Sequence, residues 1–213
     1  MPCQRIKVLM ERDERTLWDQ RYREGSHTSL EPDPFLVKAW SKFLAPRSPG
    51  NALDVAGGAG RNALWLAQRG WRVRLIDGSE AGIALAKENA RMLEPESGQP
   101  ALPQPGGRIE TQLLDLNSIR SLGHSQYDLV LVFFYLQRAL FPAIAAALKP
   151  GGLLMYKTYT IDQQRFDPGP RNPDYLLQPG ELQEAFRSLC LLHYQENLAS
   201  TATAELVAEK PAT

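Results

Sequence analysis

The sequence carries no excess of either charge and is poor in cysteine. Its 213 residues include 24 lysine and arginine side chains and 24 aspartate and glutamate side chains, so the formal net charge is zero. Proteins that bind a phosphate backbone usually carry more basic than acidic side chains, so the zero net charge disfavours a nucleic-acid partner. The two cysteines, Cys3 and Cys190, are far apart and predict free thiols in a reducing cytosol rather than a disulfide framework.

A signal segment and a membrane span are also missing from the pattern. Residues 1–16 hold a short apolar patch and then charges, without the long apolar region of a signal peptide. The most apolar stretch, 128–148, is long enough to cross a bilayer, but Gln137, Arg138 and Pro142 interrupt it. A buried strand followed by a helix explains this stretch better. We therefore expect a cytoplasmic protein without membrane contact, either a monomer or a homodimer.

Histidine is sparse as well, with three residues in the chain. His27, His124 and His193 have no cysteine, aspartate or glutamate at metal-ligand spacing, so we expect no metal site. His27 follows an aromatic helix and is best interpreted as a solvated loop residue, with substrate contact as the alternative.

The chain does show a regular alternation of apolar strands and helices. Five apolar runs predict strands, at 52–56, 71–77, 108–115, 127–135 and 153–160. Helical patterns separate most of these strands, and residues 190–210 alternate like an antiparallel hairpin. This order predicts an α/β fold, a Rossmann-like doubly wound sheet of seven strands with an antiparallel C-terminal hairpin.

Two extra helices are expected before the first strand. Residues 11–24 form a charged helical pattern with Trp18 and Tyr22 on one face, and Asp33 and Pro34 begin a second helix. We expect one domain over residues 1–213, with an N-terminal helical region at 1–45 and a Rossmann-like core at 50–210. Two Pro-rich stretches, 95–108 and 161–180, predict surface loops near the active site.

The first strand runs into a glycine-rich turn. Residues 54–62 read D-V-A-G-G-A-G-R-N, at the carboxyl end of the strand, where open α/β sheets bind ligands. Glycines let backbone N–H groups approach a ligand, and the N-terminus of the next helix is electropositive. Residues 58–63 also spell G-x-G-x-x-A, the dinucleotide fingerprint, so the turn by itself leaves an NAD-dependent oxidoreductase open.

Acidic residues near the strand ends favour a different cofactor. Asp54 precedes the glycines and can face an ammonium group, which suits a cofactor that carries an amino acid. Asp115 ends the third predicted strand, where it can accept a hydrogen bond from an adenine amino group. Asp77 ends the second strand, the position of a ribose-binding acid with either cofactor. The C-terminal hairpin is not needed by an NAD domain.

Motifs in this order resemble those of class I S-adenosylmethionine-dependent methyltransferases over about residues 15–210. The segments that carry the resemblance are ALDVAGGAGRNALWLA, LIDGSE, QLLDL, YDLVLVFFYL and LKPGGLLMY. Residues 18–22, W-D-Q-R-Y, are similar to the N-terminal motif of the tellurite-resistance and thiopurine methyltransferase group. The predicted cofactor-binding residues are Trp18, Tyr22, Asp54, Gly57, Gly58, Gly60, Asn62, Asp77, Gly78, Asp115, Leu116 and Phe133. Trp18 and Tyr22 would cover the cofactor, or else be core contacts of an amphipathic helix.

The resemblance implies transfer of a methyl group from S-adenosylmethionine to a small-molecule acceptor, with chalcogen or thiol compounds favoured. The alternatives are an NAD-dependent oxidoreductase and a non-catalytic S-adenosylmethionine-binding protein. Acceptor contacts are expected from Tyr135, Tyr159 and Arg138, the last of which would bind an anionic group or else be a solvated surface arginine. We assign no catalytic residue, because the pattern offers no clear general base.

The sequence departs from the family pattern in two places. Ala56 replaces the usual first glycine, and its methyl group should be tolerated if φ there is negative. No Asn/Asp-Pro-Pro-Tyr segment follows the fourth strand, which reads F-F-Y-L at 133–136, so methylation of amino groups on DNA bases is not expected.

Overall fold

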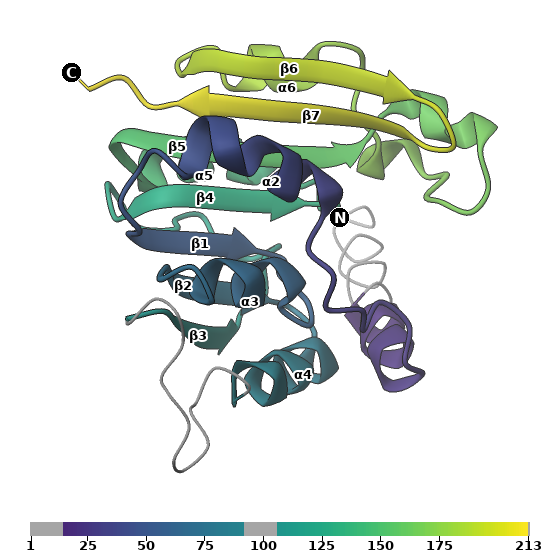
Figure 1. Cartoon of the computed structure of the whole chain (residues 1–213). Helices are drawn as coiled ribbons and strands as arrows, with labels where there is room; N and C mark the ends of the chain where they lie inside the picture. Colours follow the sequence, from purple (N-terminus) through teal and green to yellow (C-terminus); the bar gives the residue numbers. More distant parts are fainter. Residues whose placement is uncertain (1–14, 92–105, 213) are drawn as a thin grey trace. The chain divides into compact units, whose positions relative to one another are not determined.

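A computed structural model describes residues 15–91 and 106–212 (Figure 1). Seven strands form one sheet in the order β3-β2-β1-β4-β5-β7-β6. They are β1 (Asn51–Val55), β2 (Arg72–Asp77), β3 (Arg108–Leu113), β4 (Tyr127–Phe133), β5 (Leu148–Tyr159), β6 (Cys190–Leu198) and β7 (Ala202–Glu209). The pairs β2–β3, β1–β4 and β4–β5 are parallel, whereas β7 runs antiparallel to both β5 and β6. The predicted seven-stranded sheet with an antiparallel C-terminal hairpin is confirmed.

The helices follow the predicted order. Residues 15–23 are helical. The further helices are α2 (Pro34–Ala39), η1 (Trp40–Leu44), α3 (Arg61–Ala67), α4 (Glu80–Arg91), η2 (Arg138–Leu140), α5 (Phe141–Ala147), η3 (Ile161–Arg165), η4 (Pro173–Tyr175) and α6 (Glu181–Ala185). Asp33 accepts a hydrogen bond from the Phe35 amide at 2.8 Å, and Pro34 is the first residue of α2, so the predicted start of this helix is confirmed.

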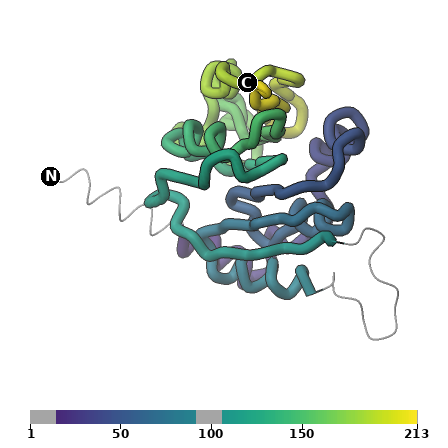
Figure 2. The backbone as a smooth tube through the Cα atoms, turned by 90° about the vertical axis from the view of Figure 1, so that its left-hand side faces the viewer, coloured from purple at the N-terminus to yellow at the C-terminus, as the bar shows by residue number. Residues whose placement is uncertain are grey.

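The chain divides into two compact units. The first unit comprises residues up to Pro49 together with Ala56–Ser118, and the second comprises Gly50–Val55 together with the residues from Ile119 onward. In the first unit, α3 and α4 pack on β2 and β3; in the second, α5 packs on β4 and β5, and α6 packs on β7 (Figure 2). A single domain over residues 1–213 stays a prediction.

Burial explains the apolar runs of the central strands. In β1 and β4 every residue except Asn51 and Asp128 is buried, as expected for parallel strands covered on both faces. The stretch 128–148 contains β4 and α5, as predicted. No helix within the described parts of the chain is long and apolar enough to cross a bilayer.

Some predictions differ from the structure or fall outside it. β3 ends at Leu113, so Asp115 lies two residues beyond the strand that it was expected to end. β5 already begins at Leu148, because Leu148 pairs with Tyr127 of β4 before the register shifts and Leu153 pairs with Leu129. Cys190 is free and exposed, whereas Cys3 lies outside the described residues. Most of the Pro-rich loop predicted at 95–108 lies outside them as well.

Candidate functional site

The glycine turn joins β1 to α3 in a conformation that requires glycine. Gly58 and Gly60 are buried and adopt φ angles of +55° and +87°. A Cβ atom on Gly60 would lie 3.3 Å from Leu75 Cδ1 and 3.4 Å from Ala86 Cβ. This glycine therefore lets α4 and β2 pack closely against the start of α3.

Asp77 at the end of β2 is held by backbone N–H groups. Its side chain is 8% exposed, its Oδ2 accepts from the Gly58 amide at 2.8 Å, and its Oδ1 accepts from the Ser79 amide at 2.8 Å. Burial raises the pKa of Asp77, and the nearby charge of Asp19 adds to this, although backbone N–H groups of Ser79, Gly58 and Gly78 offset part of it. Each carboxylate oxygen has a second lone pair, so the two oxygens can accept hydrogen bonds from the two hydroxyls of a ribose.

Ala56 does not meet the condition under which its methyl group would be tolerated without strain. Its φ angle is +56°, in the left-handed region, rather than negative. A left-handed conformation costs a residue with a Cβ roughly 1–2 kcal/mol. The turn imposes it, because the Gly57 amide is bound to Ile76 O at 3.2 Å and the Gly58 amide is bound to Asp77. Strain of this kind often occurs at functional turns.

The structure places Tyr22 on the glycine turn. A Cβ atom on Gly58 would lie 2.0 Å from Tyr22 Oη, and one on Gly82 would lie 3.0 Å from Tyr22 Cε2. The Trp18 ring lies 5.1 Å from the ring of His27, and 4.8 Å from the Arg21 guanidinium carbon. Tyr22 is therefore positioned to cover a ligand on the turn, and both cofactor-covering roles stay predictions.

Two predicted cofactor residues also have structural partners. Asn62 is 4% exposed, and its Oδ1 accepts from the Asp33 amide at 2.9 Å, which ties α3 to the start of α2. Asp115 is exposed, and its Oδ1 accepts from the Asn117 amide at 3.1 Å. Leu116 beside it is buried. Contact of these residues with a cofactor stays a prediction.

Asp54 and Phe133 belong to the second unit. Asp54 in β1 is 2% exposed and lies opposite Leu131 of β4. Phe133 at the end of β4 is buried and lies opposite Lys157 of β5. In paired strands, side chains two residues apart share one face, so the Asp54 and Phe133 side chains lie on the same face of this part of the sheet.

An aromatic and charged cluster lies after β4, and its charged members Lys157 and Glu205 were not predicted. Phe134 adopts a φ of +57°, an outlier for a bulky residue, and its ring lies 5.1 Å from that of Tyr159. Lys157 Nζ lies 5.5 Å from the centre of the Phe134 ring and 3.2 Å from Glu205 Oε1. Strands β5 and β7 pair Lys157 with Glu205, which only the antiparallel register of these strands reveals.

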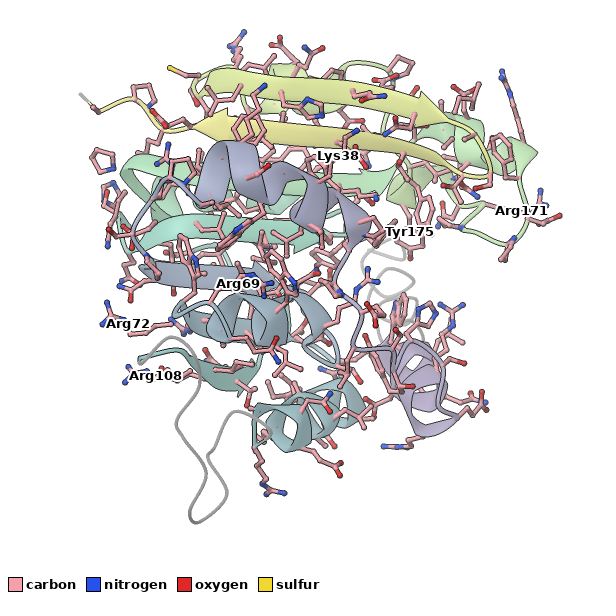
Figure 3. The ribbon with its side chains drawn as sticks, in the orientation of Figure 1. Lys38, Arg69, Arg72, Arg108, Arg171 and Tyr175 are labelled. Atoms are coloured by element: carbon pink, nitrogen blue, oxygen red, sulfur yellow. The ribbon has the colours of Figure 1, made fainter. Side chains whose placement is uncertain are left out.

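Arg138 has a structural role that the sequence did not predict. Its Nε and Nη2 bind the two carboxylate oxygens of Glu181 at 2.5 Å and 2.9 Å. Its Nη1 donates to Asp174 O at 2.8 Å, and Nη2 donates to Leu176 O at 2.9 Å. These bonds use four of the five N–H groups of a guanidinium. Arg138 therefore braces the segment after η3, which also carries Tyr175 (Figure 3). These four hydrogen bonds disfavour binding of an acceptor by the Arg138 guanidinium.

The backbone of Tyr135 takes part in the packing of β5. Its carbonyl oxygen accepts a hydrogen bond from Tyr156 Oη at 2.8 Å. Tyr156 is fully buried between the rings of Phe141 and Phe186. Burial raises the pKa of Tyr156, so this phenol stays protonated and donates to Tyr135. A contact between the Tyr135 side chain and an acceptor stays a prediction.

The chain is similar to known methyltransferases. A family model described as a methyltransferase domain matches residues 30–198. A search of curated proteins finds no match. Among solved structures, TehB from Haemophilus influenzae is similar at 21% identity and a TM-score of 0.67, over 90% of this chain and 67% of TehB.

Two further structures share the fold. The N-methyltransferase NodS from Bradyrhizobium japonicum is similar at 16% identity and a TM-score of 0.62, over 84% of this chain and 98% of NodS. The magnesium protoporphyrin IX methyltransferase ChlM from Synechocystis, with bound S-adenosylmethionine, is similar at 18% identity and a TM-score of 0.59, over 82% of this chain and 77% of ChlM.

Proposed function

Because this chain belongs to the methyltransferase domain family, we propose that it transfers a methyl group from S-adenosylmethionine to a small-molecule acceptor. The family match includes the glycine turn, Asp77 and strands β1 to β6. The chain is a class I methyltransferase, and its methyl donor is S-adenosylmethionine. We propose the class of acceptor and the roles of individual residues.

The main support for the proposed cofactor site is the buried carboxylate of Asp77. Its two oxygens are fixed by the Gly58 and Ser79 amides, so they are oriented before a ligand arrives. Asp77 would accept hydrogen bonds from the ribose hydroxyls, and Gly58 would allow close approach of the ligand to the backbone. Tyr22 would exclude water from the turn.

S-adenosylmethionine supplies a methyl group on a positively charged sulfur, and this charge disappears as the methyl moves. A partly desolvated aromatic surface favours that loss of charge, and Phe133, Phe134 and Tyr159 are candidates to provide it. Much of the rate would come from holding the acceptor in line with the methyl group. We assign no general base, because a soft nucleophile or a carboxylate acceptor needs none.

A small acceptor is favoured by the charge balance of the chain, which offers no basic excess for a nucleic acid. The resemblance of residues 18–22 to the N-terminal motif of the tellurite-resistance and thiopurine methyltransferase group makes chalcogen oxyanions and thiols the first compounds to test. Family membership removes the support for an NAD-dependent oxidoreductase, which rested on the G-x-G-x-x-A spacing and on an acid that suits either cofactor. A non-catalytic S-adenosylmethionine-binding protein is the competing proposal.

Transfer of a labelled methyl group separates these proposals. Purified protein is incubated with methyl-labelled S-adenosylmethionine and a small-metabolite extract, then with tellurite, selenite and thiols one by one. We expect label in a low-molecular-mass product. S-adenosylhomocysteine should also raise the melting temperature, since a ligand at a hundred times its Kd adds about 2.7 kcal/mol. Binding without transfer to any acceptor would favour the non-catalytic protein, and stabilisation by NAD alone would contradict the proposed cofactor site.

A further inference from the structure

We propose that Asp19 is a positioning residue that fastens the N-terminal helix to the turn between β2 and α4, and so keeps Tyr22 closed over bound cofactor. This inference rests on the proposed function. The helix at 15–23 precedes residues 30–198, which the family model matches.

One face of the N-terminal helix lies against Gly58 of the glycine turn and Gly78 at the end of β2. Arg15, Asp19 and Tyr22 are spaced i, i+4 and i+7, which places them on the same side of a helix. Arg15 Cδ lies 3.7 Å from the position of a Cβ atom on Gly78, and Tyr22 lies over Gly58. Figure 1 shows this helix, in purple, beside α4. The whole arrangement lies within the first unit.

Asp19 makes the polar contacts at the centre of this face. Its Oδ1 accepts hydrogen bonds from Ser79 Oγ and, at 3.1 Å, from the Ala81 amide. A carboxylate at this place interacts favourably with the N-terminus of α4. Burial by itself would raise the pKa of Asp19, but the bonds from Ser79 and Ala81 and the charge of Arg23 outweigh it, and the pKa lies below its ordinary value. Asp19 is therefore ionised at neutral pH.

The same groups hold Asp77. Ser79 donates its amide to Asp77 and its hydroxyl to Asp19, while its Oγ accepts from the Gly82 amide at 3.0 Å. Gly58 donates its amide to Asp77 and lies under Tyr22. The Gly58 and Ser79 amides that bind the Asp77 carboxylate thus both belong to residues that the N-terminal helix contacts. Lifting the helix would remove an acceptor from Ser79 and the cover from Gly58, so helix docking and cofactor retention are coupled.

The expected signature is a change in cofactor release. Asp19 touches the turn and not the cofactor, so Asp19→Asn should leave the association rate of S-adenosylhomocysteine nearly unchanged and raise its dissociation rate. A hydrogen bond to a charged group corresponds to about a tenfold effect or more. We therefore expect Kd to rise about tenfold in Asp19→Asn and in Ser79→Ala, with little further loss in the double variant, because both remove the same contact. Ser79→Thr, which keeps the hydroxyl, should bind like the parent.

Matched controls lie on the same helix. Arg23→Gln removes the other side-chain partner of Asp19, an exposed ion pair of 2.9 Å that should contribute little. Glu24→Gln changes an exposed side chain bonded to Gln20. Both controls should keep the parent Kd. Trypsin cleavage after Arg21 or Arg23 gives a second readout, which S-adenosylhomocysteine should suppress in the parent and in Glu24→Gln, but not in Asp19→Asn.

The experiment combines calorimetry, stopped-flow binding and the protease assay on the full chain, after melting curves have verified that each variant is folded. If the parent protein binds no S-adenosylhomocysteine, the proposed function fails. If the parent binds it, and Asp19→Asn and Ser79→Ala keep the parent dissociation rate and the protection from trypsin, the role of Asp19 is overturned and the proposed function stands.

Discussion

Asp77 in the first unit and Arg138 in the second are held in different ways. In the first unit, the Asp77 carboxylate is bound by uncharged backbone N–H groups of Gly58 and Ser79. In the second unit, Arg138 and Glu181 neutralise each other through two bonds. A carboxylate held by backbone N–H groups keeps a lone pair on each oxygen for a ligand, whereas in the two-bond ion pair the charges of Arg138 and Glu181 offset each other. The first arrangement suits ligand binding and the second suits bracing a loop.

The largest expected effect follows from changing Asp77. Asp77→Asn places an amide NH2 where one oxygen accepts from the Gly58 or Ser79 amide, so a donor would face a donor. We expect Kd for S-adenosylhomocysteine to rise at least about tenfold, which is roughly 1.4 kcal/mol. The free energy of unfolding without ligand should also fall, by about 1–3 kcal/mol. Calorimetry and chemical denaturation measure the two effects.

The matched change in the second unit is Glu181→Gln. It breaks the bond pair to Arg138 and should leave cofactor affinity unchanged. Equal weakening of cofactor binding in both variants would remove the contrast between the units.

A pH titration tests the charge on Asp77. Burial raises its pKa above the roughly 3.9 of an unfolded aspartate. Ribose hydroxyls donate to the ionised form, so affinity should be full above the folded pKa and fall by up to about tenfold per pH unit below it. Its effect on folding has the opposite sign: the stabilisation is complete below the unfolded pKa and is lost as pH rises through the folded pKa. Calorimetric Kd values between about pH 4 and 8 should slope in the parent and flatten in Asp77→Asn.

Loss of Arg138 should disturb the second unit alone. Arg138→Ala removes the bonds to Glu181, Asp174 O and Leu176 O. Because the Arg138 side chain is 40% exposed, we expect a modest loss of about 1 kcal/mol in the free energy of unfolding. Hydrogen exchange should increase in the segment at 173–181. Arg138→Lys should restore little, since lysine lacks the planar fork. A weaker affinity for the acceptor, with unchanged exchange in this segment, would instead support the acceptor role.

The smallest expected effect is a gain in stability at Ala56. Ala56→Gly removes the strain of a left-handed alanine, partly offset by the greater freedom of glycine in the unfolded chain, and should add up to about 1 kcal/mol. For a chain of this size that is roughly 2–4 °C in melting temperature. Ala59→Gly in the same turn is the control, because Ala59 is buried and has no positive φ. A loss of stability in Ala56→Gly equal to that in Ala59→Gly would contradict the strain.

Local sequence was sufficient for the features that depend on neighbours in the chain. The order of strands and helices, the start of α2 at Asp33 and the C-terminal hairpin follow from apolar periodicity and capping chemistry. The placement of Asp77 at the end of β2 was also predictable, because a buried strand must end before a polar turn. The conformation of Ala56 was not, since it is set by bonds from the next two residues to β2.

The α/β class, the glycine turn and the acid that ends the second strand could be predicted from the amino acids, because each is encoded within a few consecutive residues. Which distant side chains meet depends on the folded structure. Folding brings Asp19 to Ser79, 60 positions away, and Arg138 to Glu181, 43 positions away. Such contacts depend on how the elements pack and on the strand register. No periodicity in one segment specifies a partner in another.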